Sequence, residues 1–211
     1  MQKSTPMTAQ TPQLYLITPP VIDLDHFPAQ LARLCDSHEI ACLRLAIATQ
    51  DEDTILRTGD ALREMAHERD IPLVIADHVL MVARLGLDGV HLGDTRRPVR
   101  KLRTELGEDA IIGAFCGSSR HDGMGAGEAG ADYVSFGPVG ATKLGTGEQA
   151  TSDLFAWWSE MISIPVVAEG ALSRELIETL APVTDFFAIG NEIWTTDDPL
   201  KTFAELTAPL R

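Results

Sequence analysis

Charged side chains directly follow a short apolar run in the segment DGVHLGDTRRP, residues 88–98. His91 lies within the run, Asp94 follows it, and Arg96 and Arg97 come next. Carboxylate oxygens are ligands for hard cations such as Mg2+, and arginine side chains bind phosphate oxygens. The segment therefore predicts a loop that binds a phosphorylated ligand together with a cation.

Basic residues and glycines at the ends of other apolar runs predict further contacts to an anion. Arg44 interrupts the run IACLRLAI, so its charge must face a polar site or meet a partner. Lys143 follows the run YVSFGPV in a glycine-rich stretch. Gly170 and Gly190 end two later runs, where backbone N–H groups can approach a phosphate, as in many barrel enzymes.

Acidic residues at the ends of the same runs predict a cation site. Asp77, Asp94, Glu169 and Glu192 supply the oxygen ligands that Mg2+ prefers. Asp77 also has an ordinary alternative, because an aspartate beside His78 could cap the helix that follows.

Ordinary alternatives remain for the other candidates as well. His91 could be a hydrogen-bonded core histidine, and Lys143 could be an exposed loop residue. Arg96 and Arg97 could form a solvated helix start, although cations there oppose the helix dipole.

Eight short apolar runs read as strands that are covered on both faces, at residues 13–18, 40–47, 72–77, 89–93, 110–115, 133–139, 165–170 and 185–190. Segments with helical spacing begin at residues 29, 53, 100, 153, 173 and 200. Ser173 predicts a helix N-cap, and Gly107 predicts a helix end. The alternation predicts an α/β fold, a (β/α)8 TIM barrel in a single compact domain over residues 13–211, preceded by a flexible tail at residues 1–12. A doubly wound open sheet is the rival, but no GxGxxG follows the first run.

The formal net charge of −14 limits the classes of partner. An acidic surface repels phosphate backbones and anionic lipid, so we expect phosphorylated small molecules as substrates, and neither nucleic acid nor membrane. The three cysteines form no CxxC pair, and no apolar run approaches the ~20 residues of a membrane span. We expect a cytoplasmic protein whose oligomeric state the sequence leaves open, a homo-oligomer included.

Several of these runs resemble thiamine phosphate synthase. The similar phrases are LYLIT, GLDGVHLGD, IIGAFCGS, AGADYVSFGPV with TK just after, and IPVVAEGAL, and they extend in order over about residues 13–193. The resemblance implies a barrel enzyme that joins hydroxymethylpyrimidine diphosphate to thiazole phosphate, with Mg2+ and with release of pyrophosphate. The implied chemistry is dissociative: pyrophosphate leaves first, and the thiazole nitrogen attacks the resulting pyrimidine cation.

Some positions depart from the family pattern and predict a degenerate active site. The QxREK pattern of the second strand reads CLRLA at residues 42–46, so the arginine remains and the pyrophosphate-binding lysine becomes Ala46. The Asn-Asp pair of the third strand reads Ala76-Asp77, and the HLGQxD loop reads HLGDTR at residues 91–96. Glu169 stands where the family has a neutral residue, and a carboxylate there would repel a phosphate.

Combining the residues with the resemblance gives a set of site predictions. We assign catalysis to Arg44, Lys143 and His91; phosphate binding to Arg96, Thr142, Gly170, Gly190 and Asn191; and Mg2+ binding to Asp77 and Asp94. Two alternatives stay open. One is a TenI-like thiazole tautomerase, for which His121 would have to replace a histidine absent at Gly117, and the other is a catalytically degenerate barrel that binds a phosphate ligand.

Overall fold

The computed structural model describes residues 11–94 and 98–211. Most of the predicted N-terminal tail, residues 1–10, lies outside the described residues, as do Arg96 and Arg97.

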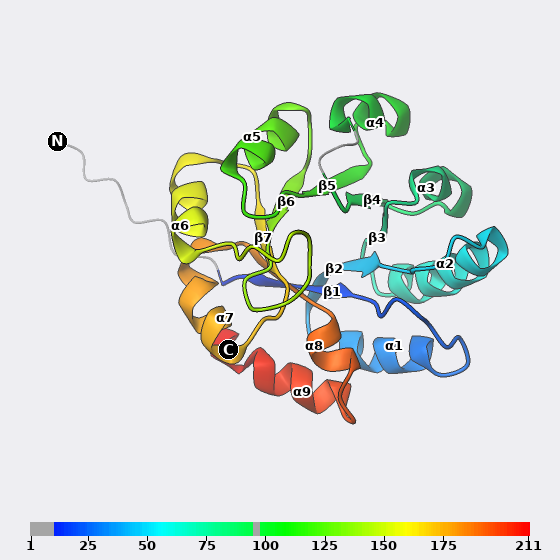
Figure 1. Cartoon of the computed structure of the whole chain (residues 1–211). Helices are drawn as coiled ribbons and strands as arrows, with labels where there is room; N and C mark the ends of the chain where they lie inside the picture. The colour runs from blue at the N-terminus through cyan, green and yellow to red at the C-terminus, as the bar shows by residue number, and fades with distance from the viewer. Residues whose placement is uncertain (1–10, 95–97) are drawn as a thin grey trace.

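The eight predicted strands form a closed parallel barrel in sequence order, with helices around its outside (Figure 1). The strands are β1 Gln13–Ile17, β2 Ile40–Leu45, β3 Leu73–Ala76, β4 Gly89–Leu92, β5 Ile111–Phe115, β6 Tyr133–Phe136, β7 Val166–Glu169 and β8 Phe186–Ile189. The prediction of a TIM barrel is confirmed, and the open-sheet rival is wrong because β1 pairs with β8.

Helices follow the strands around the barrel. They are α1 Phe27–Ser37, α2 Glu52–His67, α3 Val79–Leu85, α4 Val99–Leu106, α5 Arg120–Glu128, α6 Ser152–Met161, α7 Arg174–Leu180, α8 Asn191–Trp194 and α9 Pro199–Leu206, with 3-10 turns at Ala181–Val183 and Ala208–Leu210. As predicted, the Ser173 hydroxyl accepts a hydrogen bond from the Leu176 N–H and caps α7, and Gly107 ends α4 at φ +90°. Within the described part of the chain, no helix is long and apolar enough to span a bilayer.

The structure adds α3, α5 and α8 to the helices expected from the sequence. The segment of α5, RHDGMGAGE, is glycine-rich and a poor helix former by itself. Its glycines serve close packing, because a Cβ on Gly123 would lie 2.7 Å from the Trp158 ring, and one on Gly127 would lie 2.2 Å from Ile164. Tertiary packing on α6 and on the segment between α6 and β7 therefore overrides local propensity here.

Alternate residues of the strands face the inside of the barrel, where they form a lower apolar layer and, nearer the carboxyl ends of the strands, an upper charged layer. The lower layer is apolar and aromatic and is made by Tyr15, Cys42, Val74, Tyr133, Val167 and Ala188. Two residues further along β2 and β7 stand Arg44 and Glu169, which the two-residue period of a strand turns to the same inner face. The barrel interior therefore becomes charged toward its carboxyl end, where enzymes of this architecture carry their sites.

Candidate functional site

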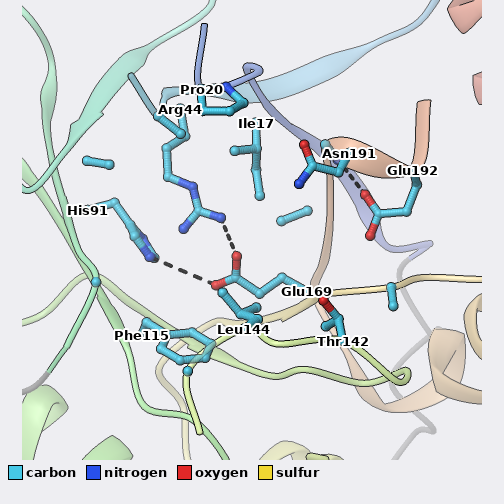
Figure 2. Close-up of a pocket in the computed structure, with 18 of the residues that line it drawn as sticks. Ile17, Pro20, Arg44, His91, Phe115, Thr142, Leu144, Glu169, Asn191 and Glu192 are labelled. Carbon is cyan, nitrogen blue, oxygen red and sulfur yellow. Dashed lines mark hydrogen bonds and ion pairs between the residues drawn. The ribbon is translucent and has the colours of Figure 1, made fainter. Parts of the chain in front are cut away.

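A cavity of about 550 Å³ opens at the carboxyl ends of the strands (Figure 2). Its wall includes residues from the ends of the strands, from the loop between β6 and α6, and from the loops after β7 and β8. The volume is within the range of ~300–1,000 Å³ that is typical of small-molecule sites.

The charged centre of the cavity is an ion pair between Arg44 of β2 and Glu169 of β7, which extends across the barrel. Both residues are buried, with 5% and 3% of their surface exposed. Burial is the largest single influence on the Arg44 guanidinium and lowers its pKa, but the charge and hydrogen bond of Glu169 together with the nearby Tyr15 and Tyr133 outweigh burial and raise that pKa above its ordinary value. The Arg44 guanidinium also lies 5.4 Å from the centre of the Tyr15 ring. The expectation that Arg44 meets a partner is confirmed, and the positive charge of Arg44 in turn offsets the negative charge of Glu169.

One oxygen of Glu169 is left without a hydrogen bond. Arg44 contacts Oε2, whereas Oε1 is buried and has no hydrogen-bond partner among the described residues. The His91 ring also faces Oε1, with its Nε2 3.9 Å away. Figure 2 shows the Arg44 and His91 side chains converging on this carboxylate from one side. A bound ligand with an N–H donor or a positive charge would satisfy this oxygen.

His91 is held at the cavity wall by two buried tyrosines. Its Nδ1 lies 2.9 Å from the Tyr133 hydroxyl, which lies 2.7 Å from the Tyr15 hydroxyl. Burial, and secondarily the positive charge of Arg44, hold the pKa of His91 well below its ordinary value, so its imidazole is neutral at physiological pH. Burial raises the pKa of both tyrosines, so their hydroxyls stay protonated. His91 is thus the hydrogen-bonded core histidine of one interpretation and also part of the cavity wall.

A second carboxylate lies at another corner of the cavity, on the loops after β7 and β8. Glu192 Oε1 accepts a hydrogen bond of 3.0 Å from the Leu172 N–H, and its Oε2 accepts one of 2.8 Å from the Gly190 N–H. The prediction from sequence placed a phosphate on the Gly190 amide and a cation on Glu192. In the structure these two candidates contact each other, because the Glu192 carboxylate accepts the hydrogen bond of the Gly190 amide.

The two predicted Mg2+ ligands follow neighbouring strands. The Asp77 Oδ1 accepts a hydrogen bond of 2.9 Å from the Gly93 N–H, and Asp94 follows β4. The alternative that Asp77 caps α3 is wrong, because the N-cap is His78 and makes no side-chain cap bond. Over residues 11–94 and 98–211, no group of three or more histidine, cysteine, aspartate or glutamate side chains is placed to hold a metal ion.

The other predicted site residues divide into two groups. Thr142, Gly170 and Asn191 line the cavity. Lys143 is exposed on the loop beside Thr142 and does not belong to the described wall. Arg96 lies outside the described residues.

Sequence reasoning missed the apolar part of the wall, which Ile17, Phe115 and Leu144 contribute. The signal was present for Ile17 and Phe115, because both end a strand and therefore stand at the mouth. Ala46 and Ala76, which stand where the resemblance implies a lysine and an asparagine, also line the cavity.

The sequence comparisons decide the family. The model of the family described as thiamine monophosphate synthase matches residues 14–191. The thiamine-phosphate synthase of Rhodospirillum centenum is 39% identical over 186 residues, covering 86% of this chain and 89% of that protein. This chain belongs to the thiamine monophosphate synthase family.

Further comparisons agree with this family assignment. The thiamine-phosphate synthase of Erythrobacter litoralis is 36% identical and covers 93% of this chain and 95% of its own. Among solved structures, thiamine phosphate pyrophosphorylase from Pyrococcus furiosus superimposes with a TM-score of 0.80 at 23% identity, covering 94% of this chain and 95% of that one. The structural likeness supports the fold, and the sequence relatives place the chain among thiamine-biosynthetic transferases.

Proposed function

We propose that this family member joins hydroxymethylpyrimidine diphosphate to thiazole phosphate, with release of pyrophosphate. The observation that carries the proposal is the buried Oε1 of Glu169, which belongs to a residue of the cavity wall and has no hydrogen-bond partner among the described residues. In a dissociative reaction the pyrimidine becomes a cation once pyrophosphate leaves. A buried, fixed carboxylate oxygen stabilises that cation, and burial makes its field stronger than it would be in water.

The remaining residues position the reactants in this proposal. The neutral His91, fixed by Tyr133, orients the pyrimidine ring against Glu169. Thr142, Gly170 and Asn191 bind phosphate or hydroxyl oxygens from the other side of the cavity. Arg44 fixes the Glu169 carboxylate and presents its remaining donors to the leaving group. We keep catalytic or phosphate-binding roles for Lys143 and Arg96 as proposals.

Asp77 and Asp94 fit Mg2+ by their chemistry. Mg2+ retains several waters and is usually held by one or two carboxylates together with the phosphates of the substrate, so a group of three protein ligands is not needed. Both carboxylates follow strands that pair with each other at the mouth. When bound, Mg2+ would offset the charge of the departing pyrophosphate.

We also propose that the pyrophosphate end of the site is degenerate. Ala46 and Ala76 line the cavity at positions where the family pattern has a lysine and an asparagine. Each lost hydrogen bond to a charged oxygen reduces binding by about 1.5–3 kcal/mol. The diphosphate is therefore bound more weakly here than where both side chains are present.

We further propose a reducing compartment, the cytoplasm, as the location of this enzyme. Cys35, Cys42 and Cys116 are unpaired. Burial raises the pKa of the Cys42 and Cys116 thiols to about 12 and that of the Cys35 thiol to about 11, which makes all three weak nucleophiles.

A thiazole tautomerase is the second candidate function, and the same Glu169 oxygen favours it. A partly unsatisfied carboxylate beside a neutral imidazole can take a proton from one ring position and return it to another. His121 does not serve this purpose, because it is exposed on α5 and does not belong to the cavity wall. Interconversion of thiazole isomers, followed by NMR, measures this activity.

The proposed transfer is tested by measuring pyrophosphate release with and without Mg2+ and thiazole phosphate. We expect release that needs both, and Asp77→Asn should raise the Mg2+ concentration needed for half-maximal rate. Asp25→Asn, which removes an exposed carboxylate on the loop before α1, is the matched control and should behave as wild type. Folded protein that releases no pyrophosphate but is thermally stabilised by the ligands would instead be a binding barrel.

A further inference from the structure

Two backbone N–H groups from different loops converge on the carboxylate of Glu192. One belongs to Leu172, after β7, and the other to Gly190, after β8. Each binds a different carboxylate oxygen, at 3.0 and 2.8 Å, so both donors are used by one anionic group. Loops after the last two strands are where barrel enzymes commonly bind a phosphate. In this chain an internal carboxylate takes that position.

The carboxylate competes with any ligand phosphate at this corner. A phosphate can reach the two N–H groups only if Glu192 gives up both hydrogen bonds, which are of the stronger, charge-assisted kind. If Glu192 stays in place, a phosphate beside it meets a like charge. Arg44 cannot offset this repulsion fully, because its charge is paired with Glu169.

Neutral groups meet no such obstacle at the same corner. The side chains of Thr142 and Asn191 line the cavity with Glu192, and Figure 2 shows the Asn191 and Glu192 side chains next to each other at the start of α8. Hydroxyl and amide groups of this kind bind an alcohol through neutral hydrogen bonds, and the Glu192 carboxylate can accept one more from its hydroxyl.

We infer that Glu192 is a specificity-determining residue that prevents a phosphate on the acceptor from adding to its binding affinity. The cavity then binds a heteroaromatic acceptor that ends in a free hydroxyl at least as tightly as it binds the phosphate ester of that acceptor. The inference rests on the proposed function for the identity of the acceptor. It concerns a different corner of the cavity from the Glu169 oxygen on which the transfer chemistry rests.

The experiment measures dissociation constants of hydroxyethylthiazole and of its phosphate by calorimetry, without the diphosphate. For the wild type we expect the two constants to agree within about threefold. Glu192→Ala should shift the preference toward the phosphate by ~10-fold or more, because the phosphate then gains the hydrogen bonds of the two N–H groups. Asp197→Ala removes an exposed acid from the same loop region and should leave the ratio as in wild type.

Two results would overturn the inference. One is a wild type that already binds the phosphate more than about thirtyfold more tightly than the alcohol, since ~2 kcal/mol of preference is incompatible with a competing carboxylate. The other is a Glu192→Ala variant with an unchanged ratio. Glu192→Gln, which keeps one acceptor and removes the charge, should show a smaller shift in the same direction, and it replaces the alanine variant if that variant does not fold.

Inorganic phosphate separates this inference from the proposed function. If neither thiazole binds, the proposed acceptor is wrong, but the corner can still be tested with phosphate alone. Millimolar phosphate should then raise the melting temperature of Glu192→Ala more than that of wild type at equal ionic strength. Equal shifts for the two proteins would overturn the role of Glu192 itself.

Discussion

Replacement of Arg44 by methionine should cost more stability than replacement of any exposed arginine. The change leaves Glu169 as a buried carboxylate without its cation, and the two side chains are only 6% and 4% exposed, so water cannot screen the loss. Removing one member of a buried ion pair typically costs about 3–5 kcal/mol. The loss of the contact between Arg44 and the Tyr15 ring adds to this cost.

The assay is urea unfolding followed by tryptophan fluorescence, with a double variant to isolate the pair. Arg44→Met should lower the free energy of unfolding by about 3–5 kcal/mol, whereas Arg44→Met with Glu169→Leu should recover most of that loss, because no unpaired charge is then buried. The matched control is Arg174→Met, which breaks an exposed i,i+4 pair with Glu178 and should cost under about 0.5 kcal/mol.

An Arg44→Met variant that stayed within about 1 kcal/mol of wild type, a value typical of a solvated pair, would contradict the cost expected for a buried unpaired carboxylate. So would a double variant that is less stable than the single variant, since the cost would then come from lost packing and not from an uncompensated charge.

Ala46→Lys should restore a cation to the cavity wall and lower the KM for hydroxymethylpyrimidine diphosphate by ~10-fold or more, measured by pyrophosphate release; an unchanged KM would separate residue 46 from the diphosphate. Because the pKa of His91 is held well below its unfolded value of about 6.5, the unfolded chain takes up the proton first as pH falls; the stability is therefore complete above about pH 6.5 and decreases below it by up to ~1.4 kcal/mol per pH unit. Urea titrations from pH 7.5 to 5 should show a shallower decrease for His91→Gln, and parallel curves would contradict the assignment. Ser173→Ala removes the N-cap of α7 and should cost about 0.5–2 kcal/mol, measured by thermal unfolding, and no loss would mean that the cap contributes nothing.

The strands of this fold were predictable because each is a short apolar run bounded by turn residues, and closure followed from their number and alternation with helices. The helix α5 was not predictable, since its glycines argue against a helix until Trp158 and Ile164 are seen to require close approach. The helix propensity of a segment depends on its own residues, so it cannot reveal a packing neighbour such as Trp158 or Ile164, which is more than thirty residues away in the chain.

The site was predicted as a set of strand ends, but the pairings within it were not. Arg44 and Glu169 are separated by 125 residues and lie on strands that are not neighbours in the barrel, so only the curvature of the closed sheet brings them together. Glu192 was expected to bind a cation because its carboxylate is a good oxygen ligand. Its actual partners are backbone amides, which have no signature in the side-chain sequence.

The most direct test of the central claim is the mass of the product formed from isotope-labelled thiazole phosphate and hydroxymethylpyrimidine diphosphate in the presence of Mg2+. We expect a labelled product whose mass equals that of hydroxymethylpyrimidine joined to thiazole phosphate, with one pyrophosphate released per product. Unchanged labelled thiazole phosphate together with free hydroxymethylpyrimidine would show that the cavity hydrolyses the diphosphate without joining the rings, and recovery of both reactants unchanged would show that it does neither. Either result would contradict the proposed transfer.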